Sequence, residues 1–180
     1  MKIIKNESLS AIKTQIRQQT AQTTNPQVAI SVANIISDVR QRGDEALRDY
    51  SVRFDGVALN NFKVSESDID SAIAQVPDRV IAALKKAAAN ITSFHQLEVA
   101  QSFEDTARSG VIRGTKVTPL SAVGIYVPGG TAAYPSSVLM NAIPAKIAGV
   151  DNIVMVTPPQ PEGLNPAVLA AAKIAGVDNI

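Results

Sequence analysis

The residues best suited to binding chemistry lie in one segment, GIYVPGGTAAYPSS, which runs from Gly124 to Ser137. Gly129 and Gly130 let backbone amides approach a ligand closely, and free N–H groups at the start of the helix expected next favour an anion. We expect this segment at the carboxyl end of a parallel strand, where open α/β sheets bind ligands. Its spacing differs from the GxGxxG dinucleotide fingerprint. The residues alone leave two interpretations equally open, a ligand loop or a tight turn with Tyr126 packed at the strand end.

Other residue types with catalytic potential are scattered along the chain. The chain has one histidine, His95, and no cysteine, so His95 lacks companions for a metal site, and no partner for a general base is evident. We interpret it as a partly exposed helix residue. Glu66, Asp68 and Asp70 resemble a hard-metal cluster, but they fall in an expected first helical turn, where carboxylates are favoured electrostatically.

Two residues of the loop itself have both a binding and a structural interpretation. Tyr134 and Ser136 are placed to position a substrate, while Ser136 equally suits a helix N-cap. The residues by themselves therefore give a plausible ligand loop and no catalytic set.

Composition excludes several classes of function. Seventeen basic and sixteen acidic residues leave a formal net charge of +1, which gives no electrostatic basis for binding nucleic acid or an anionic membrane. No stretch approaches the ~18 apolar residues of a membrane span, and the apolar part of MKIIKNESLS is too short for a signal peptide. The absence of cysteine is compatible with a reducing compartment. We expect a cytoplasmic protein.

Amphipathic helices are expected through most of residues 8 to 100. The first has Leu9, Ile12 and Ile16 on one face. Asn25 as N-cap and Pro26 at the first helical position open a second helix, which Gly43 ends. The later elements are a third helix from Asp44 to Phe54, an extended FKVS segment, a helix from Asp68 to Ala74 with Ser65 as its capping residue, and a long helix from Pro77 through Phe94.

The pattern changes beyond residue 110 to strands alternating with helices. Extended segments are expected over Val111–Val117 and Ala122–Val127, and the loop after them leads to a helix capped by Ser136 or Ser137 and kinked or split by Pro144. Strand IVMVT, a proline-rich loop and a helix from Ala167 to Ala175 follow. This order is typical of a doubly wound α/β fold. We place the boundary near Thr118, with a mainly helical part over 1–118 and an α/β part over 119–180.

One nine-residue sequence occurs twice. AKIAGVDNI spans Ala145–Ile153 and again Ala172–Ile180, a spacing that fits one strand and one returning helix. The first copy leads into a strand, whereas the second ends where a strand is due. We therefore expect the sheet to be cut at Ile180, with an unpaired apolar edge, and the chain to be the amino-terminal part of something longer.

Two segments carry a resemblance to a known family. RGDEALRDYSVRFDG, from Arg42 to Gly56, and PLSAVGIYVPGGTAAYPSSVLMNAIPAKIAGV, from Pro119 to Val150, resemble the amino-terminal part of histidinol dehydrogenases. The resemblance implies an incomplete Rossmann-like domain, and an enzyme that oxidises L-histidinol to L-histidine through the aldehyde with NAD and zinc, as a homodimer. It also implies that Tyr126 and Pro128 contact NAD.

The same resemblance implies that the catalytic and zinc-binding residues lie beyond Ile180, so we expect the chain by itself to be inactive. Two alternatives stay open. One is a nucleotide- or phosphate-binding module without catalysis. The other is a helical module, formed by the first ~100 residues, that binds another subunit.

Overall fold

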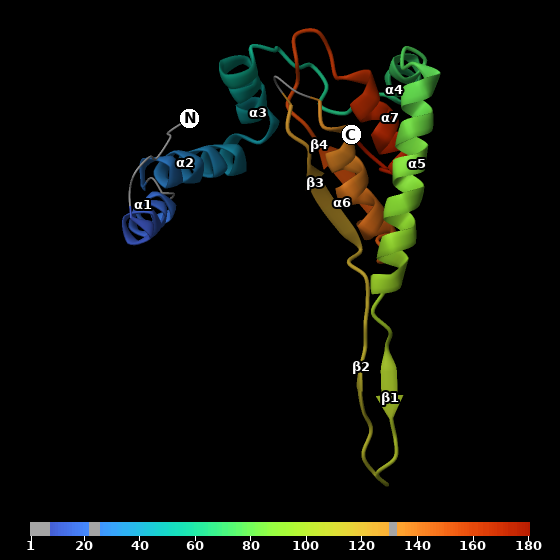
Figure 1. The fold of residues 1–180 in the computed structure, drawn as a ribbon. Coiled ribbons are helices and arrows are strands. Elements are labelled where there is room, and N and C mark those ends of the chain that lie inside the picture. Colours follow the sequence, from blue (N-terminus) through green and yellow to red (C-terminus); the bar gives the residue numbers. More distant parts are fainter. Residues whose placement is uncertain (1–7, 22–25, 130–132) are drawn as a thin grey trace. The chain divides into compact units, whose positions relative to one another are not determined.

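The computed structural model describes residues 8–21, 26–129 and 133–180, without the side chains of residues 18–21. The chain divides into two compact units, Met1–Tyr50 and Ser51–Ile180, which are described separately below (Figure 1). The predicted N-cap Asn25 and loop residue Gly130 lie outside the described residues. The predicted domain boundary near residue 118 stays a prediction.

In its described residues the first unit has three helices, and an arginine side chain bonds two of them together. They are α1 (Leu9–Ala21), α2 (Pro26–Arg42) and α3 (Asp44–Tyr50). Gly43 takes a left-handed φ of 59° and ends α2 as predicted. Arg42 then donates to Asp38 on its own helix and to Asp49 on α3, both at 2.7 Å. The Arg42 bond, and after it a bond from Tyr50, lower the pKa of Asp38 to about 2.

The prediction of one α-helix from Asp44 to Phe54 is wrong, because the last part of this segment is a π-helix. The α-helix ends at Tyr50, and a π-helix, η1 (Ser51–Asp55), continues the coil. Gly56 has a φ of 70° and its N–H bonds the Val52 carbonyl at 3.2 Å, which is a left-handed termination. The wider turn lets the next N–H, that of Val57, reach the Ser51 carbonyl at 3.3 Å.

Two of the second unit's helices begin close to their predicted positions. In α4 (Glu66–Ile73) the N-cap Ser65 accepts a hydrogen bond from the Asp68 N–H, so the helix starts two residues before its predicted start. The long α5 (Asp78–His95) follows Pro77, whose fixed φ of −57° suits a helix start. A short 3₁₀ turn, η2 (Gln96–Glu98), continues α5.

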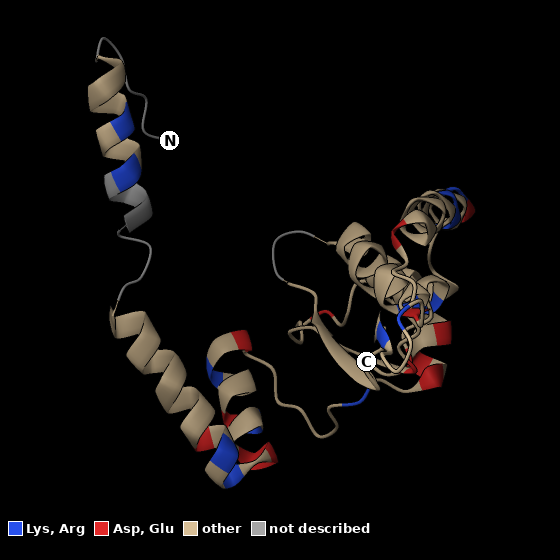
Figure 2. Ribbon diagram, turned by 90° about the horizontal axis from the view of Figure 1, so that it is seen from below, with Lys and Arg blue, Asp and Glu red and all other residues tan. Residues whose placement is uncertain are grey.

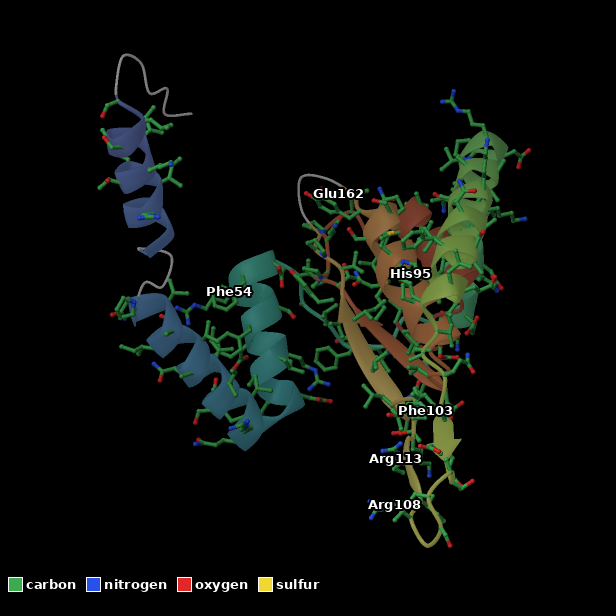
Figure 3. All side chains as sticks on the ribbon, turned by 60° about the horizontal axis from the view of Figure 1, so that its bottom comes forward. Phe54, His95, Phe103, Arg108, Arg113 and Glu162 are labelled. Atoms are coloured by element: carbon green, nitrogen blue, oxygen red, sulfur yellow. The ribbon has the colours of Figure 1, made fainter. Side chains whose placement is uncertain are left out.

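An antiparallel hairpin of β1 (Phe103–Asp105) and β2 (Arg113–Thr115) follows. The sequence predicts only one extended segment here, Val111–Val117, because residues 101–107 are too polar to show the alternation of apolar and polar residues that is typical of a strand. The hairpin is held by backbone pairing and by Arg113 donating to its cross-strand neighbour Asp105 at 2.7 Å (Figure 3). A Cβ at Gly114 would lie 2.1 Å from the Phe103 carbonyl oxygen, so this close pairing requires glycine.

The strand–helix order predicted for the last sixty residues is confirmed. Two parallel strands pair in register, with Ala122 opposite Asn152 and Tyr126 opposite Val156. The elements are β3 (Ala122–Tyr126), α6 (Pro135–Ile147), β4 (Asn152–Val156) and α7 (Pro166–Ala175). The chain is thus a mixed α/β protein, mostly helical with small sheets.

Two predicted details of α6 are wrong. Tyr134 is the N-cap and makes no side-chain capping bond, so neither Ser136 nor Ser137 caps the helix. Proline at the first helical position, Pro135, needs no N–H partner and moves the start ahead of both serines. The helix also runs unbroken through Pro144, so it is not split there, because packing against α5 and α7 stabilises it on both sides of the missing hydrogen bond. The predicted kink stays a prediction.

The core lies on one face of the β3–β4 sheet. Helices α5, α6 and α7 occupy that side (Figure 1). Strand residues alternate, so that Ile125, Ile153 and Met155 are buried and their neighbours face outward. Small alanines on α7 let it pack closely against α6; the fully or almost fully buried ones are Ala170, Ala171 and Ala172. Each large side chain buried here contributes roughly 1.5–3 kcal/mol.

The two copies of AKIAGVDNI are joined by a hydrogen bond and an ion pair. Asp178 of the second copy accepts the N–H of Ile153 at 2.8 Å and pairs with Lys146 of the first copy at 3.0 Å. Beside it, Asn179 forms a parallel bridge to Val154. The second copy has therefore already begun a third strand beside β4. The edge predicted to be unpaired, where the second copy ends, is therefore partly covered by Asn179. Within the described residues, the edge with no strand beside it is that of β3.

Asp178→Asn tests the contacts that Asp178 makes with the first copy. The N–H of Ile153, and after it Lys146, lower the pKa of Asp178, so its charge stabilises the fold above the unfolded pKa of about 3.9 and stops doing so as pH falls through the folded pKa. Because the side chain is 37% exposed, we expect a loss of about 1 kcal/mol at pH 7, or about 2–4 °C in Tm. The loss should shrink below about pH 4.

The matched control is Asp151→Asn, the same position in the first copy, where the carboxylate is exposed and makes no such bond. Thermal melts of both variants from pH 2.5 to 7 measure the difference. Equal effects at the two positions would contradict the assigned role of Asp178.

Candidate functional site

The candidate site lies at the carboxyl end of β3. Tyr126 is the last residue of the strand, and the residue is 63% exposed. The next residue, Val127, is fully buried and its N–H bonds the Val156 carbonyl at 3.0 Å. Strand pairing therefore holds the backbone rigid to the point where the loop begins, while the tyrosine ring stays available to a ligand.

The loop after Tyr126 touches the loop after β4. A Cβ at Gly129 would lie 2.9 Å from the side-chain nitrogen of Gln160 and 3.5 Å from Pro158. Glycine at 129 thus gives close approach between two loops at the carboxyl edge of the sheet, which is the ligand position of open α/β folds. Pro128, between Val127 and Gly129, is half-buried. The sequence did not point to Gln160, because a polar residue in a proline-rich loop has no recognisable pattern.

The start of α6 has fewer unbonded backbone N–H groups for an anion than the sequence predicts. Pro135 has no N–H, and the Ser137 N–H bonds the Tyr134 carbonyl at 3.1 Å. Within the described residues, the Ser136 N–H is the first-turn donor left without a partner, and no acidic side chain lies in that turn. At the equivalent end of α7, Asn165 caps the helix by accepting from the Ala167 N–H at 2.9 Å. Of these two starts, α6 is the one that, within the described residues, leaves a first-turn N–H without a partner.

His95 lies away from this site. It is the last residue of α5, its side chain is 20% exposed, and its Nδ1 lies 2.5 Å from a Glu98 carboxylate oxygen (Figure 3). Both residues line an open pocket of about 640 Å³ together with Pro119 and Leu120, which precede β3. The pocket is thus at the amino end of the strand, whereas Tyr126 is at its carboxyl end.

The acidic residues of α4 have structural partners. Asp68 accepts a hydrogen bond from the Ser65 hydroxyl at 2.6 Å. Asp70 forms an ion pair with Lys173 of α7, which raises the pKa of that lysine. Across the described ranges, no three His, Cys, Asp or Glu side chains lie together as a metal site. None of the helices in those ranges is long and apolar enough to cross a membrane.

Gly129→Ala tests the contact between the two loops. The new methyl group overlaps the Gln160 side chain, which must turn away, and we expect a loss of about 0.5–1.5 kcal/mol. Adding Gln160→Ala should recover part of that loss, so a double-mutant cycle of unfolding free energies should give a coupling of about 0.5 kcal/mol or more. Strict additivity would show that the loops do not touch.

Comparison with known proteins places this geometry in a family. A sequence model described as histidinol dehydrogenase matches residues 17–180. The histidinol dehydrogenase of Lactiplantibacillus plantarum is 54% identical over the whole chain, which covers 42% of that relative, and that of Listeria innocua is 52% identical over 94% of the chain, covering 40% of the relative. This chain therefore spans about two fifths of the length of these relatives.

A solved structure agrees with the sequence comparison. The crystal structure of histidinol dehydrogenase from Elizabethkingia anophelis superimposes with a TM-score of 0.78 and 34% sequence identity, covering 99% of this chain and 37% of that one. The fold and the sequence agree over nearly all of the chain. The predicted resemblance is confirmed, and the chain belongs to the histidinol dehydrogenase family.

Proposed function

We propose that this chain supplies the first part of an NAD-dependent, zinc-containing histidinol dehydrogenase, a cytoplasmic homodimer that oxidises L-histidinol to L-histidine through the aldehyde in histidine biosynthesis. Family membership supports the reaction class. The observation that carries the chain's own part in it is the exposed ring of Tyr126 at the carboxyl end of β3, beside the close-packed Gly129 loop.

The chain's contribution is to bind and orient the cofactor, which accepts hydride from the substrate. The ring of Tyr126 offers NAD a flat apolar surface on a backbone fixed by strand pairing. Pro128 limits the direction in which the loop leaves the strand. The Ser136 N–H at the start of α6, which has no partner among the described residues, suits an anionic group of the cofactor. These assignments support an incomplete Rossmann-like domain that binds NAD without the usual glycine fingerprint.

The residues described here do not fit the zinc ion. His95 pairs with Glu98 at the other end of β3, and the carboxylates of α4 are engaged with Ser65 and Lys173. We propose that the zinc ligands and the groups that move protons come from outside residues 1–180. The chain by itself should then produce no NADH from histidinol.

Tyr126→Ala is the central test, made in a hybrid protein in which this chain replaces the matching part of the L. plantarum relative. Loss of the aromatic contact, worth about 1 kcal/mol, should raise KM for NAD about fivefold to tenfold. Tm and zinc content should stay unchanged, because the side chain is outside the core. Tyr126→Phe should retain most of the affinity if stacking dominates.

Phe103→Ala is the matched control, since Phe103 is 62% exposed on the hairpin, close to the 63% of Tyr126. A large drop in Tm with an unchanged KM for NAD would make Tyr126 a packing residue. A hybrid that bound NAD but left histidinol unoxidised would favour the alternative of a non-catalytic nucleotide-binding module.

Subunit interaction is a second candidate function, favoured by α2. This helix has no buried residue, and it carries no charge before Asp38 (Figure 2). Its apolar residues recur every three or four positions, as in a helix that packs on another; the exposed ones on this stripe are Val28, Val32 and Ile36. We propose that this stripe belongs to the homodimer contact.

Val32→Asp tests that contact. A carboxylate placed in an apolar interface is costly to desolvate, so we expect the dimer Kd of the 180-residue chain to rise at least tenfold in sedimentation equilibrium. Asn34→Asp, an exposed position on another side of α2, is the control and should leave Kd unchanged. A chain that stays monomeric at high concentration would contradict the proposal.

A further inference from the structure

Gln160 lies between the two loops at the carboxyl edge of the β3–β4 sheet. It belongs to the loop after β4, and its side-chain nitrogen lies 2.9 Å from the position of a Cβ on Gly129, in the loop after β3. The residue is half-buried, and among the described residues its side-chain amide has no hydrogen-bond partner. An amide in this state offers donors and an acceptor to a ligand that enters between the loops.

The backbone around Gln160 is stiff. Pro158 and Pro159 precede it and Pro161 follows it, and proline fixes its own φ and restricts the residue before it to extended conformations. The Gln160 carbonyl also accepts a hydrogen bond from the Gly163 N–H at 2.9 Å, in a turn where Gly163 has a left-handed φ of 86°. Little backbone freedom is therefore left to lose when a ligand binds.

The order of the elements indicates which part of a dinucleotide meets Gln160. Strand β3, helix α6 and strand β4 form one βαβ unit with parallel pairing. In dinucleotide-binding units of this kind the diphosphate lies at the start of the helix, and a polar side chain further along the unit hydrogen-bonds the adenosine ribose. Gln160 is the first carboxylate or amide side chain after β4, so it has the position of the residue that recognises the ribose.

Glu162 is a second candidate in the same loop. Its side chain is exposed (Figure 3), whereas Gln160 is half-buried beside Gly129. A ligand at the sheet edge lies between the two loops, and this favours Gln160 over Glu162.

We propose that Gln160 hydrogen-bonds the 2′-hydroxyl of the adenosine ribose of NAD. This inference rests on the proposed function, because it needs a dinucleotide bound at the Tyr126 end of β3. Gln160 also sets the cofactor specificity. A neutral amide accepts a hydrogen bond from the hydroxyl, but unlike the usual carboxylate it does not repel the 2′-phosphate of NADP by charge.

The test removes this hydrogen bond from either side in the hybrid protein. Calorimetric titration gives Kd for NAD and for the NAD analogue that lacks the adenosine 2′-hydroxyl, with and without Gln160→Ala. We expect either change alone to raise Kd about threefold to tenfold, the range for one neutral hydrogen bond. Both changes together should raise Kd no further than one of them alone, because each removes the same bond.

Gln160→Glu keeps the length of the side chain and tests the specificity. The carboxylate still accepts from the ribose hydroxyl, so Kd for NAD should stay within about twofold, whereas repulsion of the 2′-phosphate should raise Kd for NADP at least tenfold. Gln101→Ala is the matched control, since it shortens an exposed glutamine beside the pocket at the amino end of β3. It should leave all of these constants unchanged.

Two results would overturn the proposal in a hybrid that binds NAD. The first is a Gln160→Ala variant that leaves Kd for NAD unchanged or weakens NAD and the analogue by the same factor, which would make Gln160 a packing residue of the loops. The second is an effect of the missing hydroxyl that disappears in Glu162→Ala and persists in Gln160→Ala. A hybrid that binds neither NAD nor NADP would overturn the proposed function together with this inference.

Discussion

Close packing of α6 and α7 on one face of the β3–β4 sheet is the constraint on which residues 51–180 depend. The inward side chains Ile125, Ile153 and Met155 are buried, and the buried alanines of α7 let it pack closely against α6. A tight contact of this kind tolerates little change in volume. It also fixes the position of both strands relative to the helices, so the loops at the carboxyl ends of the strands start from rigid positions.

The repeated sequence contributes to this rigidity through polar contacts. Asp178 accepts the N–H of Ile153 in β4 and pairs with Lys146 of α6, so the second copy is bonded to the helix and the strand that contain the first copy. Its counterpart lysine in the second copy, Lys173, pairs with Asp70 of α4 instead. Identical residues thus make different contacts, because each copy has different neighbours.

The same packing explains why the site is asymmetric. One face of the sheet is covered by α6, on which α5 and α7 pack, and the opposite face exposes Tyr126 and Val156 at the carboxyl end. The contact between Gly129 and Gln160 brings the two loops together at that end. An exposed aromatic ring on a fixed strand, next to a constrained glycine loop, is a surface on which a flat ligand is bound with little loss of conformational freedom.

The sequence by itself determined the family, the helices with clear caps or glycine stops, and the strand–helix order after residue 120. These features depend on local signals, such as Ser65 with Asp68, Gly43, and the apolar run of β4. It did not determine the hairpin partner Phe103–Asp105 or the continuity of α6 through Pro144, since each depends on contacts with another segment of the chain. It also did not determine the π turn after Tyr50. For the site, sequence resemblance pointed to Tyr126 and Pro128 as proposed cofactor contacts. Only the tertiary structure decided that Gln160 lies against Gly129 and that Gly124 lies on the exposed face of the β3–β4 sheet, because contacts between residues far apart in the chain leave no local pattern.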